Sequence, residues 1–320
     1  MSGSPAREPS APDFRSLDFD RLWAGRDRVT EVERLVVREA LATATPSRVL
    51  ELGTGAGRLS PVIQEGAREY AALDITPEFL ARVPVRNGTT SLRVAANVYH
   101  LPFADGTFPA VVMIRVLGFL EDPRAALEEI GRVMRPGALL VVSYNPHPSV
   151  ASLIDDLKVG LSRGPNGRMS SMTFSGRPRV PVRPSSFPAW SLTRAEFHRT
   201  VAAAGLTWVI ERPTGWEEYP LLRLLPAEFF QSLSHAAAGA GAFPTRFALL
   251  RRPGQPVGPP VEWDRTLACP ACRSPLETPA SQASLALPCA QCRRVWTWQD
   301  GVLDARWPVP AGTGPVVTRP

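Results

Sequence analysis

The stretch Arg48-Val-Leu-Glu-Leu-Gly-Thr-Gly-Ala-Gly57, together with Ala71-Ala-Leu-Asp74, decides the fold of this chain. Residues 49–52 are a short, largely apolar run that we expect to be a buried strand, and it ends in a glycine-rich turn. A second short apolar run ends in Asp74, 21 positions after Gly53. In a doubly wound α/β domain, such glycines let the backbone approach a nucleoside cofactor, and such an acid accepts hydrogen bonds from ribose hydroxyls.

The spacing of the glycines separates two kinds of cofactor. A dinucleotide fingerprint, G-x-G-x-x-G, would place a third glycine at position 58, where this chain has Arg58. The pattern here is E-x-G-x-G-x-G, with glycines at 53, 55 and 57. A dinucleotide site is therefore disfavoured.

This pattern resembles the first motif of the class I S-adenosylmethionine-dependent methyltransferases, and further motifs follow in the family's order. Asn97-Val-Tyr-His-Leu-Pro-Phe-Ala-Asp-Gly-Thr-Phe108 is similar to the segment D-A-x-x-L-P-F-x-D-x-S-F-D, and residues 126–137 are similar to the R-x-L-K-P-G-G turn. The resemblance, to the type 11 branch, covers about residues 20–252 and is strongest up to 145. It implies a Rossmann-like, doubly wound α/β fold with a seven-stranded sheet.

Periodicity and composition divide the rest of the chain. Apolar spacing predicts helices over 29–41 and 124–134, and a capping box predicts a third over 194–204. Strands are expected at 206–211 and 246–250, the latter as the antiparallel edge of the sheet. The predicted organisation is a disordered N-terminus (1–17), a methyltransferase domain (18–252) with an acceptor lid (146–190), a proline-rich linker (253–261), a zinc ribbon (262–307) and a tail (308–320).

The resemblance assigns cofactor-binding roles to ten residues: Glu51, Gly53, Thr54, Gly55, Gly57, Asp74, Ile75, Asn97, Val98 and Arg115. It implies that the amides of residues 53–55 bind the methionine carboxylate, that Glu51 orients the methionine end, and that Asp74 binds the ribose. The adenine would lie near Ile75 and Val98. Asn97 departs from the family's usual Asp, although an amide oxygen still accepts a hydrogen bond. Arg115 could contact the carboxylate or could be a structural ion-pair partner.

Two residues after the fifth predicted strand are candidate catalytic bases. Methyl transfer is an in-line displacement, so a base is needed only for a protonated acceptor. Tyr144 and His147 lie where acceptors bind in the family, and an exposed loop histidine is an equal alternative for His147. The chain lacks the Asn-Pro-Pro-Tyr/Phe motif of adenine-N6 methylases after its fourth strand, where it has Arg115-Val-Leu-Gly118.

The four cysteines form a compact pattern near the C-terminal end of the sequence. Cys269, Cys272, Cys289 and Cys292 follow the spacing C-x2-C-x16-C-x2-C. Two such turns can supply four thiolates to one zinc ion, which we favour over disulfides or an iron–sulfur cluster. Without a fifth ligand in reach, such a site would be structural.

The segment after the last cysteine carries a second resemblance. Residues 295–303 are similar to the Y-P-I-x-D-G-I-P end of small zinc-ribbon proteins that activate methyltransferases, although Trp-Thr-Trp replaces Tyr-Pro-Ile. The resemblance implies a stabilising or docking ribbon fused in cis. The alternative is a ribbon that binds nucleic acid, but from Glu262 onward six arginines face five acids, which disfavours phosphate binding.

One segment of the chain is rich in basic residues. The chain carries a net charge of +6, and residues 158–183 hold six bases and no acid. An arginine-lined lid suits an anionic acceptor, whereas a poorly ordered, arginine-biased loop is the alternative. Trp23 to Arg26, before the first predicted helix, could be a partial lid over the cofactor or only a packing helix.

These observations favour one function over two alternatives. We expect a cytoplasmic enzyme that uses S-adenosylmethionine and a structural zinc to methylate a small-molecule acceptor, with no membrane partner. RNA is the second candidate acceptor. The third hypothesis is a catalytically silent scaffold, against which the intact glycine loop and Asp74 argue.

Overall fold

The computed structural model describes residues 23–146, 192–218, 222–236, 243–277 and 286–307 of the chain. The α-helices are α2 (Asp27–Ala42), α3 (Ser60–Ile63), α4 (Pro77–Leu80), α5 (Pro123–Val133), α7 (Arg194–Ala203) and α8 (Ala227–Ala236). The strands are β1 (Arg48–Leu52), β2 (Glu69–Asp74), β3 (Thr90–Ala95), β4 (Phe108–Met113), β5 (Met134–Tyr144), β6 (Thr207–Thr214), β7 (Thr245–Arg251), β8 (Ala286–Pro288), β9 (Val295–Gln299) and β10 (Val302–Asp304). The expected disordered N-terminus (1–17), the lid after Pro146 and the tail (308–320) lie outside the described residues.

The strands form one sheet in the order β6-β7-β5-β4-β1-β2-β3-β10-β9-β8. Neighbouring strands from β5 to β3 pair in parallel, which confirms the doubly wound α/β fold. The order reverses at β1, because β2 lies on one side of it and β4 on the other. In such sheets, ligands bind at the carboxyl ends of the strands beside this reversal.

Two expectations about the sheet were wrong. The described residues form ten strands rather than seven, because β8, β9 and β10 continue the sheet beyond β3. The strand predicted as the antiparallel edge, β7, lies inside the sheet between β5 and β6, and β6 is the edge. The alternation of β7 could not show this, since both of its faces are buried and it pairs on both sides.

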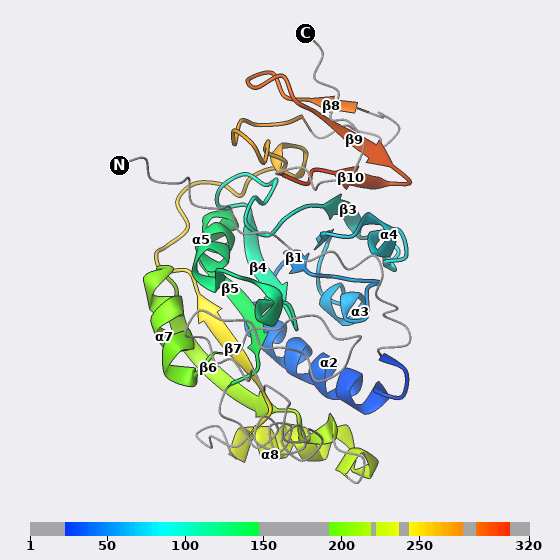
Figure 1. Ribbon diagram of the computed structural model, residues 1–320, viewed down its shortest axis with the longest axis vertical. Helices are drawn as coiled ribbons and strands as arrows, with labels where there is room; N and C mark the ends of the chain where they lie inside the picture. The colour runs from blue at the N-terminus through cyan, green and yellow to red at the C-terminus, as the bar shows by residue number, and fades with distance from the viewer. Residues whose placement is uncertain (1–22, 147–191, 219–221, 237–242, 278–285, 308–320) are drawn as a thin grey trace, which may run out of the picture.

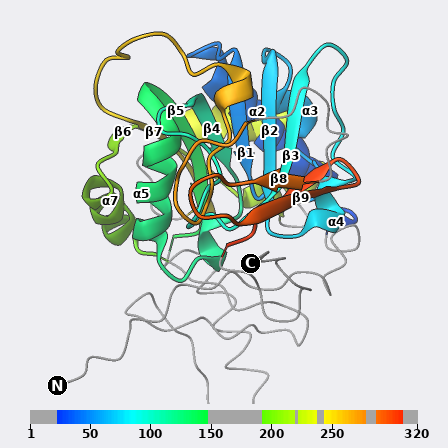
Figure 2. The ribbon, with the colours of Figure 1, turned by 90° about the horizontal axis from the view of Figure 1, so that it is seen from above.

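Helices cover both faces of the sheet (Figure 2). α5 and α7 pack on one face in a cluster that includes Leu127 and Phe197, and α2 and α3 pack on the other in a cluster that includes Val37 and Ile63. α5 and α7 begin as the sequence predicts; at α7, the Thr193 side chain accepts from the Glu196 amide in a complete capping box. Burial of these apolar faces is the main term that stabilises such an arrangement.

The C-terminal module, residues 262–307, joins the sheet through its last strand. β10 pairs in parallel with β3, with Leu303 opposite Val94 and Asp304 opposite Ala95, and β9 and β8 follow as antiparallel neighbours (Figure 1). The edge of β3, which would otherwise expose unpaired backbone groups, is therefore covered.

A second contact ties the module to the segment before β4. Phe103 and Leu267, both fully buried, form an antiparallel bridge, and the amides of Ala104 and Ala268 donate across it over 2.9 and 3.0 Å. Most of the buried apolar residues of the module belong to the same cluster as the α5 face of the sheet, and Val302 belongs to the cluster on the other face. The module and the larger sheet thus share one continuous core.

Candidate active site and metal centre

The glycine loop follows β1 and turns sharply because three of its residues have left-handed backbone conformations. The φ angles of Gly53, Gly55 and Gly57 are 68°, 55° and 86°. A Cβ on Gly53 would lie 2.1 Å from Cγ2 of Val116, and one on Gly57 would lie 2.5 Å from Cδ of Pro84. Only glycine therefore fits at 53 and 57, for reasons of packing as well as of conformation.

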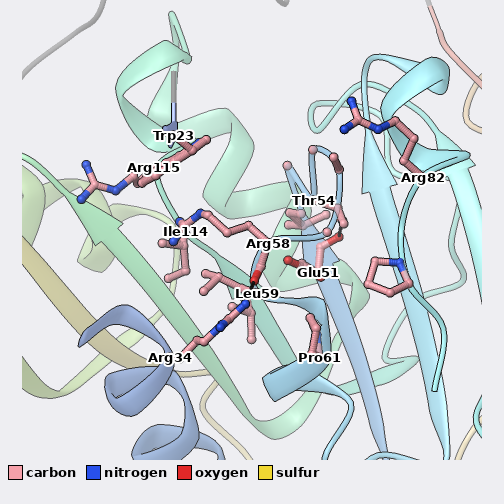
Figure 3. A pocket seen from close by; sticks show the side chains of 17 residues that line it. Trp23, Arg34, Glu51, Thr54, Arg58, Leu59, Pro61, Arg82, Ile114 and Arg115 are labelled. Carbon is pink, nitrogen blue, oxygen red and sulfur yellow. Dashed lines mark hydrogen bonds between the residues drawn. The ribbon is translucent and has the colours of Figure 1, made fainter. Parts of the chain in front are cut away.

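A cleft of about 440 Å³ lies against this loop (Figure 3). Its lining includes six of the predicted cofactor residues: Glu51, Gly53, Thr54, Gly55, Gly57 and Arg115. A Cβ on Gly55 would meet no atom within 4 Å, so the space beside this residue is open. The other four predicted residues do not line it: Asp74 is the last residue of β2, Ile75 follows β2, and Asn97 and Val98 follow β3.

Glu51 lies beneath the loop with its carboxylate almost entirely out of water. Its Oε2 accepts hydrogen bonds from the hydroxyls of Tyr70 and, over 2.7 Å, Ser60. Burial raises the pKa of the Glu51 carboxyl to about 7, although both hydroxyl donors oppose the shift. The side chain can therefore change its charge near neutral pH.

Asp74 ends β2 and is 9% exposed. Its Oδ2 accepts from the amide of Gly55 over 2.8 Å, and its Oδ1 accepts from the amide of Thr76 over 2.9 Å. Burial raises the pKa of the carboxyl, and the backbone donors oppose the shift. The carboxylate thereby fixes the glycine loop to the end of the neighbouring strand.

The amides expected to bind a carboxylate are already engaged within the protein. Those of Gly53 and Thr54 both donate to the carbonyl of Leu73, over 2.8 and 3.1 Å, and that of Gly55 donates to Asp74. The loop thus uses these donors to hold its own shape, which the sequence pattern alone could not indicate.

The residues predicted around the adenine are placed close to the end of β3. The Asn97 side chain is buried, and its Oδ1 accepts from the amide of Tyr99 over 3.2 Å, within its own turn. Val98 is buried as well, whereas Ile75 is half-buried. Asn97 therefore contributes to a local turn in this structure, as Asn and Asp side chains often do.

Arg115 lies just past β4 with a φ of 60°, an uncommon value for a residue with a side chain. Its amide donates to Oγ of Ser143 over 2.7 Å, and its Nε lies 2.6 Å from Oε1 of Glu33. Glu33 and Arg58 are functional candidates that sequence reasoning did not select. Glu33 occurs in an ordinary amphipathic helix, and nothing in that pattern marks it as buried.

Tyr144 does not suit the role of a general base. It is 4% exposed, it packs against Phe197 on the α7 face, and its hydroxyl donates to Oε1 of Glu211 over 2.5 Å. Burial, followed by this hydrogen bond to a carboxylate, raises the pKa of the Tyr144 hydroxyl far above its ordinary value. Side chains alternate between the two faces along β5, and that of Ser143 faces Arg115 at the cleft. The Tyr144 side chain therefore points to the opposite face, away from the cleft. His147 lies outside the described residues, as do residues 158–183.

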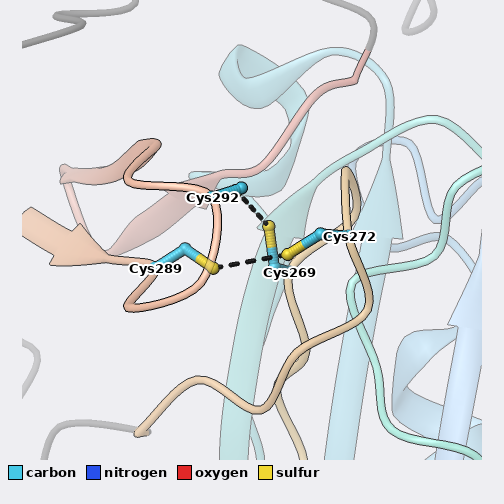
Figure 4. Close-up of side chains that lie close together, drawn as sticks. All are labelled: Cys269, Cys272, Cys289 and Cys292. Atoms are coloured by element: carbon cyan, nitrogen blue, oxygen red, sulfur yellow. Dashed lines mark hydrogen bonds between the residues drawn. The ribbon is translucent and has the colours of Figure 1, made fainter.

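The four cysteines come together in the C-terminal module (Figure 4). Their Sγ atoms all lie within 4.8 Å of one another, with 3.6 Å between Cys269 and Cys292 and 3.5 Å between Cys272 and Cys289. None of them forms a disulfide. Tetrahedral zinc with Zn–S bonds of about 2.3 Å requires sulfurs about 3.8 Å apart, so the cluster has the size of a zinc site.

Each half of the cluster is a tight turn, which we call a cysteine knuckle (residues 269–274 and 289–294). The amide of Cys269 donates to the carbonyl of Ser274 and its carbonyl accepts from Arg273, and Cys289 makes the same two bonds with Arg294 and Arg293. The two knuckles thus share one backbone design.

Among the described residues, no helix is both long and apolar enough to span a membrane.

Comparison with known proteins agrees with this geometry. A family model described as a methyltransferase domain matches residues 50–142. The demethylmenaquinone methyltransferase of Mycolicibacterium vanbaalenii is 30% identical over 190 residues, which cover 59% of this chain and 77% of that protein. The enzyme of the same name from Beutenbergia cavernae is 33% identical over 131 residues, covering 41% and 50%. The chain spans about half the length of several of the curated relatives it matches.

Solved structures show the same fold at low identity. The magnesium protoporphyrin IX methyltransferase of Synechocystis PCC 6803, solved with S-adenosylhomocysteine bound, superposes with a TM-score of 0.51. It is 16% identical, and the superposition covers 75% of this chain and 96% of that one. At this identity the likeness concerns the fold alone.

Proposed function

Because this chain belongs to the class I S-adenosylmethionine-dependent methyltransferases, we propose that it transfers the methyl group to a small-molecule acceptor beside the loop 53–57. The observation that carries the proposal is the open space at Gly55, in a cleft at the carboxyl ends of β1 and β4. Backbone that approaches a ligand closely needs a residue without a side chain, and Gly55 meets that need where the protein itself leaves room.

Two carboxylates beside the loop suit the two ends of the cofactor. Asp74 holds the loop with one lone pair of each oxygen, and its remaining lone pairs can accept the two ribose hydroxyls. Glu51 would hold the ammonium group of the methionine end, which favours the ionised form of this carboxyl. Ile75, Asn97 and Val98 would flank the adenine.

The acceptor follows from the relatives and from the chemistry of the transfer. The cofactor supplies a methyl group on a positively charged sulfur, so the chain's own residues need to align the acceptor and exclude water. The relatives at 30–33% identity are named for demethylmenaquinone, a small molecule. We therefore favour a small-molecule acceptor over RNA, for which the module, residues 262–307, offers only five arginines against five acids. His147 stays the proposed base where one is needed.

We further propose that the four cysteines bind one structural zinc and that the module stabilises the catalytic sheet in cis. The cluster has the ligand set and size of such a site, and its four thiolates leave no position for a substrate. β10 covers the edge of β3. The guanidinium of Arg48 donates to the carbonyl of Val261, just before the module, over 2.7 Å, and its carbon lies 5.3 Å from the ring centroid of Trp263. These contacts favour a stabilising module over one that binds nucleic acid.

Calorimetric titration of S-adenosylhomocysteine into the zinc-loaded protein tests the proposal. We expect micromolar binding by the wild type and a loss of more than about 100-fold in Asp74→Ala, because two charge-assisted hydrogen bonds disappear. Asp264→Ala removes an exposed acid of the C-terminal module and serves as the matched control. A folded wild type that does not bind would favour the silent scaffold.

Turnover then separates the two acceptor classes. The wild-type enzyme is incubated with labelled S-adenosylmethionine and either a panel of demethylated quinones and phenols or total RNA. Transfer to the panel without transfer to RNA is the expected result. Transfer to RNA alone would replace the small-molecule proposal.

A further inference from the structure

A buried carboxylate from α2 links two arginines at the rim of the cleft. Glu33 has no exposed surface, and its two oxygens form ion pairs with different partners. Oε1 lies 2.6 Å from Nε of Arg115, which follows β4, and Oε2 pairs with Arg58, which follows the glycine loop. A buried carboxylate shared by two guanidiniums restricts where both of them can lie.

An aromatic ring restricts the same two guanidiniums from another side. The guanidinium carbon of Arg58 lies 3.8 Å from the ring centroid of Trp23, and that of Arg115 lies 5.3 Å from it. Arg58 Nη1 also donates to Oγ1 of Thr30 over 3.2 Å. Trp23, Arg58 and Arg115 all line the cleft (Figure 3). The arginine pair is therefore held in a defined place before any ligand arrives.

The charges around the cleft do not suit most of the cofactor. Among the described residues, four arginines line it (Arg34, Arg58, Arg82 and Arg115) against one acid, Glu51. S-adenosylmethionine carries two cationic groups, the sulfonium and the ammonium, and a single anionic group, the carboxylate. Only the carboxylate is attracted by guanidiniums, which bind it through a fork of two parallel hydrogen bonds.

The loop amides that could have held this carboxylate are not available for it. Those of Gly53 and Thr54 donate to Leu73, and that of Gly55 donates to Asp74. The carboxylate therefore needs donors other than these three amides.

We propose that Arg58 and Arg115 bind the carboxylate of the cofactor's methionine end, and that Glu33 is the positioning residue that holds them for it. The inference rests on the proposed function, since it requires that this cofactor occupy the cleft. Arg58, the residue whose presence excludes the dinucleotide fingerprint, thereby gains a function of its own.

The test compares S-adenosylhomocysteine with its decarboxylated analogue, which differs only in the missing carboxylate. The measured quantity is the ratio of their dissociation constants in calorimetric titration. We expect the wild type to prefer the carboxylate form by about 30-fold, the effect of a charge-assisted pair of hydrogen bonds. Arg58→Ala should reduce the preference to about threefold or less, and Arg58→Lys, which keeps the charge but loses the fork, should lie between.

Arg82→Ala is the matched control, because Arg82 lines the opposite side of the same cleft (Figure 3). It removes the same charge and should keep most of the preference. Glu33→Gln should reduce the preference while still binding the decarboxylated analogue as the wild type does, which a merely unfolded variant would not do. Circular dichroism of each variant accompanies the titrations.

The possible failures are distinguishable. A wild type that binds neither ligand overturns the proposed function together with this inference. A wild type that binds both ligands equally, or an Arg58→Ala variant that loses affinity for both by the same factor, overturns the inference alone.

Discussion

The glycine loop and the two cysteine knuckles both need left-handed backbone conformations, but the loop uses glycines there and the knuckles use arginines. Gly53, Gly55 and Gly57 have φ angles of 68°, 55° and 86°, and in the knuckles Arg273 and Arg293 have φ angles of 62° and 59°. A residue with a side chain is strained by about 1–2 kcal/mol in this region. The loop has no such strain because its residues in this region are glycines, whereas each knuckle has one strained arginine.

The surroundings explain the difference. A Cβ at Gly53 or Gly57 would collide with Val116 or Pro84, so the loop is closely packed by its own protein. Arg293 is exposed and the Arg273 side chain is 64% exposed, so the knuckles leave room for long side chains. In the knuckles a bound metal would enforce the turn, and strained residues persist where the surroundings determine the backbone. Glycine is thus required by close approach more than by the φ angle.

Loss of the proposed zinc should destabilise the two knuckles, and this is the largest effect that we expect. Cys289→Ser removes one thiolate of the cluster. We expect a loss of about 5 kcal/mol or more, roughly 10 °C in the melting temperature, because the proposed zinc would hold together the module that covers the β3 edge. Thermal unfolding with metal analysis of the same samples measures it.

The double variant Cys289→Ser with Cys292→Ser is the control for this experiment. If the first substitution already expels the metal, the second adds little, and a chelator should bring the wild type to the same melting temperature. Additive losses with retained zinc would contradict a single four-thiolate site.

Gly53→Ala tests the loop side. We expect it to cost about 3–4 kcal/mol, the sum of backbone strain and a collision with the stiff side chain of Val116. Gly55→Ala, with a similar φ but open space, should cost only about 1 kcal/mol while weakening S-adenosylhomocysteine binding. Denaturant unfolding gives the first quantity and calorimetry the second.

Val116→Ala added to Gly53→Ala should restore part of the loss, since it removes the methyl group nearest to the new Cβ. Equal costs at 53 and 55, or no recovery in the double variant, would mean that packing does not decide the need for glycine.

The sequence predicted the elements that depend on local patterns. The strand–loop–strand unit ending at Asp74, the helices at α2 and α5 and the capped helix α7 all depend on residues close together in the chain. The cysteine spacing likewise predicted a cluster that the structure brings together.

What the sequence could not predict depends on distant residues. The pairing of β10 with β3 joins residues more than 200 positions apart, and a three-residue strand carries no periodicity that reveals its partner. The burial of Glu33 between Arg58 and Arg115 needs three segments to meet. The sequence also could not show that the Tyr144 side chain points away from the cleft, because both faces of β5 are buried and its residues show no alternation between apolar and polar.

The Glu51 carboxyl beneath the loop should make the free energy of unfolding depend on pH, and we expect this effect to be slightly smaller than that of Gly53→Ala. The pKa of Glu51 rises from 4.5 to about 7 on folding, so the folded state holds this proton more tightly. The resulting stability is fully present below about pH 4.5 and is lost as the pH rises through 7. We expect the free energy of unfolding of the ligand-free wild type, relative to Glu51→Gln, to fall by about 3 kcal/mol over this window and then level off.

Urea unfolding of both proteins at half-unit steps from pH 4.5 to 8 measures this difference. Arg293 is exposed in the C-terminal module, away from Glu51, so the stability of Arg293→Gln should change with pH in parallel with that of the wild type. A difference between wild type and Glu51→Gln that stays constant with pH would show that Glu51 is ionised throughout.

Arg293→Gly should have the smallest effect on stability. It places in a knuckle the residue type that the glycine loop uses at a similar φ angle. Glycine relieves about 1–2 kcal/mol of strain at a φ of 59° but adds freedom to the unfolded chain, so we expect a net gain of about 0.5 kcal/mol. Arg273→Gly should gain less, since it gives up the 3.3 Å ion pair with the buried Glu129. Gly55→Ala makes the reverse exchange at nearly the same φ and should have the opposite sign. If denaturant unfolding of the zinc-loaded proteins gives both substitutions the same sign, side-chain contacts rather than backbone strain decide which residue stands at these turns.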